Sequence, residues 1–440
     1  MQKLIHTRTR IEDLGKPRIV VIGGGFGGLE LVKALKGVNA QVVLFDKYNH
    51  HTFQPLLYQV ATSGLETSSI IFPFRKKFAG HKDFYFRMGE VTQILPEQNC
   101  IETSIGTVKY DYLVIATGAS TNYFGNQNIM QKSYPLKTIE DAIDLRNQII
   151  KNFELALLTD DKVLMNSLID FVIVGGGPTG VELAGSLAEL KKHVFPADYQ
   201  ELDLLEMDIH LVEGTGRLLN GMSEEAGEEA LKFLQDLGVQ VHLNTFVKDY
   251  HDDQVDLGDK KIPTKNLIWA AGVLGNPTDG LNTDVRTRNN RLKVDEYNRV
   301  EGYENIFAIG DVAAMITDDL PAGHPMVAPP AMQQGVLLAS NLQSMMQNKP
   351  LKKFSYQDQG SMATIGRNKA VVDLLVGKKP LKTQGTFAWL IWMFVHLMSL
   401  VGFRNRILVF ISWVWSYFSY DKSNRLIIGK TETLEAEEVA

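Results

Sequence analysis

Two short glycine clusters have the composition and spacing to hold a diphosphate group. Each follows an apolar run, in "PRIVVIGGGFGG" (17–28) and "DFVIVGGGPTG" (170–180), and each precedes a helix-like segment. In such a cluster the first glycine allows a tight turn, the second lets the backbone approach the phosphates, and the third lets the helix pack on the strand. The N–H groups at the helix N-terminus then favour the anion. These glycines are Gly23, Gly25 and Gly28 in the first cluster and Gly175, Gly177 and Gly180 in the second.

An acidic residue ends the apolar run that follows each cluster. Asp46 closes "QVVLFD" and Glu213 closes the strand-like "DIHLVE". A carboxylate in this place can accept hydrogen bonds from a ribose, which completes a dinucleotide site. At the second cluster it also repels a 2′-phosphate, so NADH is favoured over NADPH, with Arg217 as the one nearby cation.

Two dinucleotide sites in one chain indicate electron transfer between two cofactors. The first cluster is expected to hold a flavin nucleotide and the second a nicotinamide nucleotide. The protein must then align the two rings, because the rings themselves carry the hydride chemistry.

The remaining elements are those that a pair of Rossmann-like units needs. Strand–helix–strand units are predicted around both clusters, with strands also at 18–22, 84–121, 305–311 and 360–376 and helices at 140–158 and from about 331. At 440 residues the chain requires more than one domain. We predict an α/β fold with two Rossmann-like dinucleotide-binding domains and a C-terminal membrane-associating helical segment. The predicted parts are an FAD-binding domain in two pieces (1–125 and 286–350), an NADH-binding domain (126–285) and C-terminal strands and helices (351–440).

Several motifs beyond the glycines carry a family resemblance. "YLVIATGAS", "NLIWAAGV" and "IFAIGD" resemble the flavoproteins with two dinucleotide-binding domains. More narrowly, "NHHTFQPLLYQVATSGL" (49–65), "GGGPTGVELAGSLAEL" (175–190) and "APPAMQQG" (328–335) resemble the type II NADH dehydrogenases, the single-subunit NADH:quinone oxidoreductases that do not pump protons. The resemblance implies non-covalent FAD, NADH as substrate and a membrane quinone (menaquinone or ubiquinone) as acceptor.

The resemblance also implies roles for particular residues. The FAD residues are expected to be Gly23, Gly25, Phe26, Gly28, Asp46, Lys47, Gln54, Pro55, Leu56, Ala116, Thr117, Gly118, Gly310, Asp311, Ala331 and Lys369. Core or turn packing is the alternative for Gln54, Pro55 and Leu56, and a solvated lysine at a strand end is the alternative for Lys369. The NADH residues are expected to be Gly175, Gly177, Thr179, Gly180, Glu213 and Gly272. A helix starting after Pro330 could direct N–H groups at 331–333 toward reduced flavin.

Three residues are expected to be catalytic: Glu182, Gln333 and Gln334. Glu182, in the first turn of its helix, could hydrogen-bond the nicotinamide or relay protons; a surface acid favoured by the helix dipole is the alternative. The quinone motif of the family reads Ala-Gln-x-Ala-x-Gln, and Pro329 replaces its first Gln here. No amide contact to the quinone is therefore expected from position 329.

The C-terminal region is apolar and aromatic. Residues 386–403 contain only His396 as an ionisable group, Arg404 and Arg406 follow, and a second apolar run ends near 420. Eighteen helical residues reach ~27 Å, which barely matches a membrane core. Two helices lying in one leaflet, on an anionic lipid surface, are favoured over a spanning hairpin. The alternative is a dimer interface or a buried helical hairpin, the segment can also serve both roles, and a homodimer is expected. Trp389, Trp392, Trp413 and Trp415 suit the membrane interface.

Composition excludes several other classes. A net charge of -6 argues against nucleic-acid binding. Cys100 is the only cysteine, which disfavours disulfide and sulfide:quinone reductases, and we predict no metal site. The N-terminus lacks a secretory h-region, and Glu12 and Asp13 disfavour a transit peptide. We therefore expect a peripheral, monotopic enzyme on the cytoplasmic side of the inner membrane, probed best by a quinone reductase assay on membranes. The alternatives are a flavoenzyme with another acceptor and a slow, redox-sensing flavoprotein.

Overall fold

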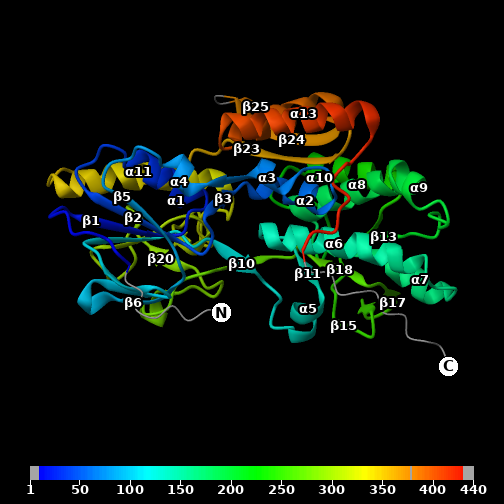
Figure 1. The fold of residues 1–440 in the computed structure, drawn as a ribbon, viewed down its shortest axis with the longest axis horizontal. Coiled ribbons are helices and arrows are strands. Elements are labelled where there is room, and N and C mark those ends of the chain that lie inside the picture. The colour runs from blue at the N-terminus through cyan, green and yellow to red at the C-terminus, as the bar shows by residue number, and fades with distance from the viewer. Residues whose placement is uncertain (1–8, 377–378, 430–440) are drawn as a thin grey trace. The chain divides into compact units, whose positions relative to one another are not determined.

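The fold was analysed in a computed structural model that describes residues 9–376 and 379–429 (Figure 1). The described chain divides into two compact units. Among the described residues, unit 1 comprises 9–52, 71–120 and 273–359, and unit 2 comprises 53–70, 121–272, 360–376 and 379–429. The predicted parts (1–125, 126–285, 286–350 and 351–440) stay a prediction; the two units are divisions by contact within the structure.

Unit 1 is built on a five-stranded parallel sheet of order β21-β9-β1-β2-β5. Its strands are short runs rich in β-branched and apolar residues, as expected for strands buried on both faces. They are β1 (Arg18–Ile22), β2 (Gln41–Asp46), β5 (Phe84–Met88), β9 (Tyr112–Ile115) and β21 (Ile306–Ala308). A three-stranded antiparallel sheet is formed by β6 (Val91–Leu95), β7 (Cys100–Thr103) and β8 (Gly106–Lys109).

Helices α1 (Phe26–Ala34) and α11 (Ala328–Met346) pack closely in unit 1 because small residues meet between them. A Cβ on Gly335 would lie 2.4 Å from the Gly27 carbonyl oxygen. The smaller elements of the unit are β3 (His50–Thr52), β4 (Ile71–Pro73), α4 (Phe74–Lys77), η2 (Pro96–Gln98), β10 (Ala119–Thr121), β19 (Val273–Gly275), η3 (Thr283–Val285), β20 (Leu292–Val294), η4 (Gly310–Val312) and β22 (Ala313–Met315).

Unit 2 repeats the parallel sheet with the order β11-β18-β12-β13-β14. The strands are β11 (Tyr134–Pro135), β12 (Phe171–Val174), β13 (Ile209–Val212), β14 (Gln240–His242) and β18 (Asn266–Trp269), and the predicted two-domain α/β fold is confirmed. Its longer helices are α6 (Ile139–Ala156), α7 (Lys162–Ile169), α8 (Pro178–His193) and α10 (Glu224–Asp236). The start of α6 is fixed by a capping box between Thr138 and Asp141.

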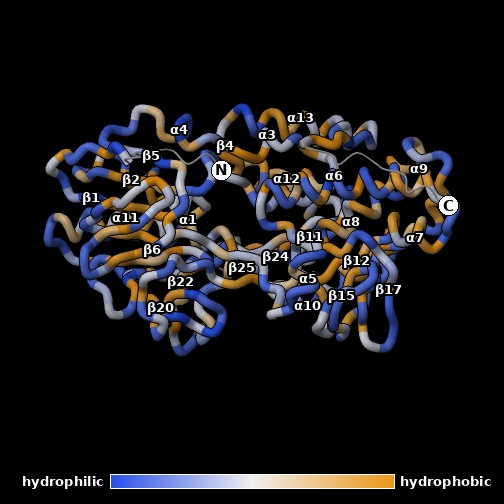
Figure 2. The backbone as a smooth tube through the Cα atoms, turned by 60° about the horizontal axis from the view of Figure 1, so that its bottom comes forward, coloured by the Kyte–Doolittle hydropathy of each residue, from blue (hydrophilic) through white to orange (hydrophobic). Residues whose placement is uncertain are grey.

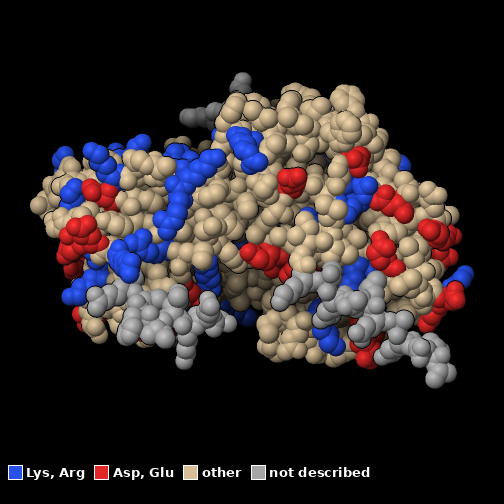
Figure 3. All heavy atoms as spheres, in the orientation of Figure 1, with Lys and Arg blue, Asp and Glu red and all other residues tan. Residues whose placement is uncertain are grey.

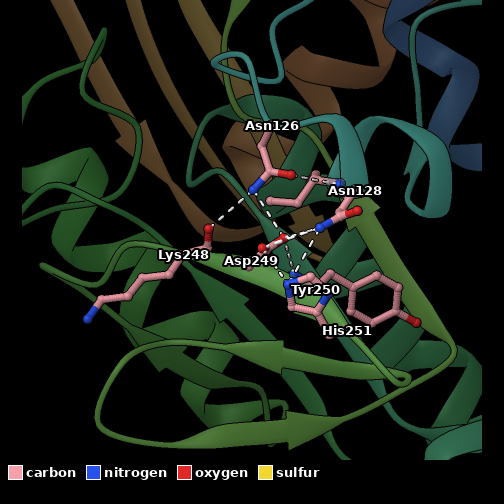
Figure 4. Close-up of polar contacts among 7 residues, drawn as sticks. Asn126, Asn128, Lys248, Asp249, Tyr250 and His251 are labelled. Atoms are coloured by element: carbon pink, nitrogen blue, oxygen red, sulfur yellow. Dashed lines mark hydrogen bonds and ion pairs between the residues drawn. The ribbon is translucent and has the colours of Figure 1, made fainter.

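A small polar cluster fixes helix α5 (Gln127–Lys132) to the antiparallel sheet of β15 (Asp249–His251), β16 (Gln254–Asp256) and β17 (Lys261–Pro263). Asn126 caps the helix through the Ile129 N–H, and its amide and that of Asn128 donate to Asp249 (Figure 4). His251 pairs with the same carboxylate at 2.6 Å. The cluster is satisfied internally, and within the described residues no group of three or more His, Cys, Asp or Glu could hold a metal.

The C-terminal part of unit 2 is a meander followed by two helices. Strands β23 (Gly360–Gly366), β24 (Lys369–Val376) and β25 (Lys379–Gln384) are antiparallel, and the sequence had predicted only the first two. Helices α12 (Gly385–Ser399) and α13 (Phe403–Ser419) follow. Gly185 of α8 lets β23 approach, since a Cβ there would lie 1.7 Å from the Ile365 carbonyl oxygen. Short elements η1 (Gln54–Leu56), α2 (Leu57–Ala61), α3 (Thr67–Ile70) and α9 (Phe195–Asp198) complete the unit.

Candidate functional site: two nucleotide cradles and an aromatic pocket

The first glycine cluster forms the turn between β1 and α1 as its sequence predicts. Gly23 has φ +100°, and a Cβ on Gly28 would lie 1.9 Å from the Gly23 carbonyl oxygen. Gly25, by contrast, has nothing within 4 Å of its Cβ position, and it precedes α1 without a side-chain cap. The loop is therefore closed where the helix meets the strand and open where a phosphate would approach.

Asp46 fastens this turn from the end of β2. Its Oδ2 accepts from the Gly24 N–H at 2.7 Å and its Oδ1 from the Tyr48 N–H at 2.8 Å. Burial raises the pKa of Asp46, although both N–H groups oppose this shift. The buried His51 ring, which sequence reasoning left without a role, contacts the Gly24 carbonyl through Nδ1 at 3.0 Å. Burial lowers the pKa of His51 to about 4, so the ring is neutral.

Other residues of unit 1 that the resemblance assigns to FAD lie at the ends of β9 and β21. The hydroxyl of Thr117 is buried and has no hydrogen-bond partner among the described residues, as expected of a group that waits for a ligand. Gly118 and Gly310 adopt positive φ angles of +69° and +74°. Together with Asp311 in η4 and the open Gly25, these features fit a bound dinucleotide, and they are residues that the resemblance implied.

Helix α11 differs from the prediction at its start. It begins at Ala328, so both prolines lie in its first turn instead of before it. Prolines have no N–H, and in a regular helix the N–H groups of Met332 and Gln333 are used within the helix. By the same rule the Ala331 N–H faces the carbonyl of the N-cap residue Val327, so a regular first turn leaves none of the expected donors at 331–333 free; Ala331 itself lies beside Gly27 and Gly310.

The two glutamines on α11 are both engaged with backbone. Gln334 is buried, and its Oε1 accepts from the Gly310 N–H at 2.7 Å. Gln333 exchanges two hydrogen bonds with the backbone of Gln357, at 2.9 and 3.0 Å. Their catalytic assignment stays a prediction, but in this structure Gln334 positions the turn that carries Asp311.

The second cradle repeats the geometry of the first. Gly175 has φ +114°, a Cβ on Gly180 would lie 1.9 Å from the Gly175 carbonyl oxygen, and Gly177 is open. Glu213 Oε2 accepts from the Gly176 N–H at 2.6 Å. Thr179 is exposed at the start of α8, where a phosphate would meet the helix N-terminus.

The loop after Glu213 is held by further polar contacts. Glu213 Oε1 accepts from both the N–H and the hydroxyl of Thr215. Arg217 donates to the Asn220 side chain and to the carbonyl oxygens of Asn220 and Met222. The guanidinium is therefore tied into its own loop, whereas the sequence had left it free to meet a 2′-phosphate.

The remaining predicted residues are placed as follows. Phe26 packs edge-on against His51, and Lys47 pairs with Glu90 at 2.6 Å in unit 1. In unit 2, Leu56 is fully buried beside Gln54 and Pro55, Gly272 has φ +76°, and Lys369 lies over the Phe233 ring. Lys369 thus points toward α10, which favours the alternative of a lysine at a strand end without a role at the flavin. Ala116 is buried at the end of β9.

Unit 2 contains a pocket between α2, α8, β23 and the two C-terminal helices. Its walls combine aromatic and apolar side chains with about as many polar and charged ones, so it could hold a partly apolar molecule that also makes hydrogen bonds. The aromatic lining residues are Tyr58, Trp389, Trp392, Trp413 and Tyr417, and the charged ones are Glu182, Glu189, Arg367 and Lys422.

Glu182 lies in this pocket, in the second turn of α8. It is 7% exposed, so the alternative of a surface acid in the first turn is wrong. Burial raises the pKa of Glu182 to about 8. The Thr364 N–H opposes this shift from 3.4 Å, and so does the Trp392 indole, although that N–H completes no hydrogen bond with a described residue. Glu182 is accordingly mostly protonated at pH 7.

The predictions from the sequence assigned some residues of this pocket to another place and left others out. Trp392 and Trp413, predicted for a membrane interface, are buried in the pocket, and Trp413 donates to Gln59 at 2.7 Å. Lys422 carried no motif and was not predicted. The inward faces could have been recognised from helical spacing. Ala388 and Trp392 in α12 lie four residues apart, as do Val409 and Trp413 in α13, and all four are buried.

Comparison with known proteins places the chain in a class. Residues 17–335 match the pyridine nucleotide-disulphide oxidoreductase family, and residues 359–419 match the NDH2 C-terminal domain. The chain therefore belongs to the pyridine nucleotide-disulphide oxidoreductases, a class defined by the two cradles described above.

Relatives of known function narrow this class. The type II NADH:quinone oxidoreductases Ndh and NdhA of Mycobacterium tuberculosis are 33% and 34% identical to the chain, over 91% and 94% of its length and 88% and 90% of theirs. NDH2 of Plasmodium falciparum, solved in complex with NADH, matches with a TM-score of 0.84 at 23% identity, over 94% of this chain and 100% of that one. The chain thus belongs to the type II NADH:quinone oxidoreductases, enzymes that use FAD and NADH, and the predicted family and cofactors are confirmed.

Proposed function

We propose that this enzyme oxidises NADH with bound FAD and reduces a membrane quinone by two electrons, without pumping protons. One observation carries the proposal. Helices α12 and α13 turn buried tryptophans into the aromatic pocket and expose an apolar face on their other side. A pocket built by lipid-facing helices suits an acceptor that is itself dissolved in lipid.

The protein's own residues would hold the cofactors and manage one proton. When bound, FAD supplies a ring system that can accept a hydride from NADH and pass electrons to a quinone. The first cradle, with Asp46, Thr117 and Asp311, would hold FAD, and the second, with Glu213, would hold NADH. Glu182 keeps a proton inside the pocket at neutral pH, where quinone reduction consumes protons.

The exposed face of the C-terminal helices supports attachment to a lipid surface. Its apolar side chains recur at helical spacing, which gives each helix an outward stripe. They are Phe387, Leu390, Phe394, Met398, Phe403, Ile407, Phe410, Ile411, Val414 and Phe418. Hydrophobic residues gather along α12 and α13 in Figure 2, and the surface over α13 in Figure 3 is almost free of charged side chains. No helix of the described chain is long and apolar enough to cross a membrane.

Attachment is best tested with point variants, because truncation before Thr386 would also remove Trp392 and Trp413 from the pocket. Phe394 and Phe418 are 65% and 79% exposed, so Phe394→Glu with Phe418→Glu should leave the fold intact and release the protein from membranes. Leu205→Glu, at an 88% exposed site of the same unit, is the matched control. A double variant that still sediments with inverted membrane vesicles would contradict lipid attachment. The cytoplasmic side and the homodimer stay predictions, which protease access and the mass of the solubilised enzyme would check.

Turnover is tested by steady-state NADH:quinone activity in membranes. We expect quinone-dependent NADH oxidation that leaves the vesicle pH gradient unchanged. An enzyme that reduces ferricyanide but no quinone would instead support the alternative of a different acceptor.

A further inference from the structure

The chain after α13 forms a strap, residues 420–428, that is fixed along unit 2 (Figure 1). The Asn424 N–H donates to the Ser63 carbonyl at 3.3 Å, and Arg425 pairs with Asp198 at 2.5 Å. Further along, the Asn147 side chain makes two hydrogen bonds with the backbone of Ile428. These contacts hold the strap at several points and so fix the position of Lys422, which lies between them and α13.

Lys422 is the residue of the strap that enters the aromatic pocket. It is 8% exposed and lines the pocket wall. Its Nζ donates to Ser186 Oγ at 2.9 Å and to the Ser186 carbonyl at 3.2 Å. The same hydroxyl contacts Thr62 Oγ1 at 2.7 Å. An ammonium has three N–H donors, so one of them is left for a ligand.

The setting of this ammonium is unusual for a structural lysine. Buried charges are normally paired, yet no carboxylate lies within ion-pair distance of Lys422 in the described part of the chain. Glu189 and Arg367 are the charged groups that act on it, with opposite effects, and Glu182 lines the same pocket. Burial lowers the pKa of Lys422 to about 8, so it is still mostly charged at pH 7.

Helix α8 arranges these polar groups along one face. Glu182, Ser186 and Glu189 are spaced i, i+4 and i+7, and all three line the pocket. The pocket therefore offers a neutral acid at Glu182 and, one helical turn further, an ammonium held by Ser186. Two separated donors among aromatic walls match a flat molecule with two carbonyl oxygens.

This inference rests on the proposed function and deepens it. We propose that Lys422 contacts the second substrate by donating a hydrogen bond to one carbonyl oxygen of the quinone, so that the C-terminal strap is part of the quinone site. A carbonyl oxygen only accepts hydrogen bonds, and it gains negative charge on reduction, which a fixed ammonium stabilises.

Binding can be measured without turnover, because Trp389, Trp392 and Trp413 line the pocket. A decyl-substituted benzoquinone should quench their fluorescence in the full-length, FAD-loaded enzyme. We expect Lys422→Met to weaken this binding about tenfold or more, which corresponds to the loss of one charged hydrogen bond. The KM for the quinone should rise equally, while NADH:ferricyanide activity stays unchanged. Lys422→Arg should recover part of the affinity, and Lys422→Gln, which keeps a neutral donor, should lie between.

Two controls separate contact from structure. Lys382→Met and Lys260→Met each remove an exposed lysine of the same unit. Both should keep the quinone Kd within about twofold of the wild-type value. Unchanged binding in Lys422→Met and Lys422→Gln, or an equal loss in either control, would overturn the proposal. A wild-type enzyme that is neither quenched nor oxidised by the quinone would overturn the proposed function itself.

Discussion

The two nucleotide cradles share one backbone plan but differ in what surrounds it. Each has a first glycine with positive φ, an open second glycine and a third glycine pressed on the first. Each is fastened by a carboxylate, Asp46 or Glu213, that accepts from the N–H of the intervening glycine. The loop geometry thus repeats with the sequence motif, whereas the attached chemistry depends on the neighbouring elements.

One pair of glutamates makes this difference clear. Glu30 and Glu182 each lie two residues after the third glycine of their cluster. Glu30 is partly buried and pairs with Lys33 at 3.0 Å on α1, whereas Glu182 is buried in the aromatic pocket without an ion-pair partner in the described part of the chain. Strand β23 packs against α8, and the C-terminal helices line the same pocket, so Glu182 is buried and its pKa is raised.

The largest effect is expected when the third glycine of either cradle gains a side chain. In Gly28→Ala or Gly180→Ala the new Cβ would lie 1.9 Å from a backbone oxygen, which cannot move freely. Each variant should lose roughly 3 kcal/mol of stability or more. Equilibrium unfolding would measure the loss, and wild-type stability for either one would break the claimed equivalence of the loops.

The second glycines should separate folding from binding. A Cβ on Gly25 or Gly177 meets nothing within 4 Å, and neither glycine has a positive φ. Both alanine variants should fold normally, but their methyl groups would occupy the approach of a diphosphate. Gly25→Ala should purify without flavin, and Gly177→Ala should keep its flavin but bind NADH at least about tenfold more weakly. The reverse assignment would show that the cofactors of the two cradles are exchanged.

Glu213 should set the choice of nicotinamide nucleotide. Glu213→Gln keeps an acceptor for the Gly176 N–H but removes the charge that repels a 2′-phosphate. We expect the ratio of kcat/KM for NADPH to that for NADH to rise about tenfold, with an unchanged flavin spectrum. The gain is limited because Arg217 is tied to Asn220, so adding Asn220→Ala should raise it further. An unmoved ratio would mean that another residue reads the ribose.

The smallest effect is a pH dependence that distinguishes the two glutamates. The Glu182 pKa rises from its ordinary 4.5 to about 8, so between these values the folded state holds a proton that the unfolded state has lost. Stability therefore falls as pH rises through this window. Glu182→Gln escapes this loss, and its Tm should gain about 3 °C over the wild type between pH 5 and pH 8. Glu30→Gln is the matched control and should follow the wild type; the same pH trend in both variants would contradict the buried acid.

The cradles could be predicted from the sequence because their function depends on the local backbone. A tight turn, an open approach and a close helix contact each require glycine, so the roles of Gly23, Gly25 and Gly28 can be recognised from the sequence alone. The roles of Lys422 and of the inward-facing Trp392 could not be predicted, because their surroundings are formed by segments far away in the chain. Ser186 and Trp392 are separated by about two hundred residues of sequence, and only packing brings them to one pocket. The start of α11 was misjudged for a local reason, since two prolines fit inside the first turn as well as before it.

The most direct test of the account is anaerobic rapid mixing of the wild-type enzyme, followed through flavin absorbance. We predict that NADH bleaches the flavin in a first step and that a decyl-substituted benzoquinone restores its absorbance in a second. In Lys422→Met the first step should keep its rate and the second should require a higher quinone concentration. A flavin that NADH reduces but the quinone does not reoxidise in the wild-type enzyme would contradict the claim that this chain delivers electrons to a quinone.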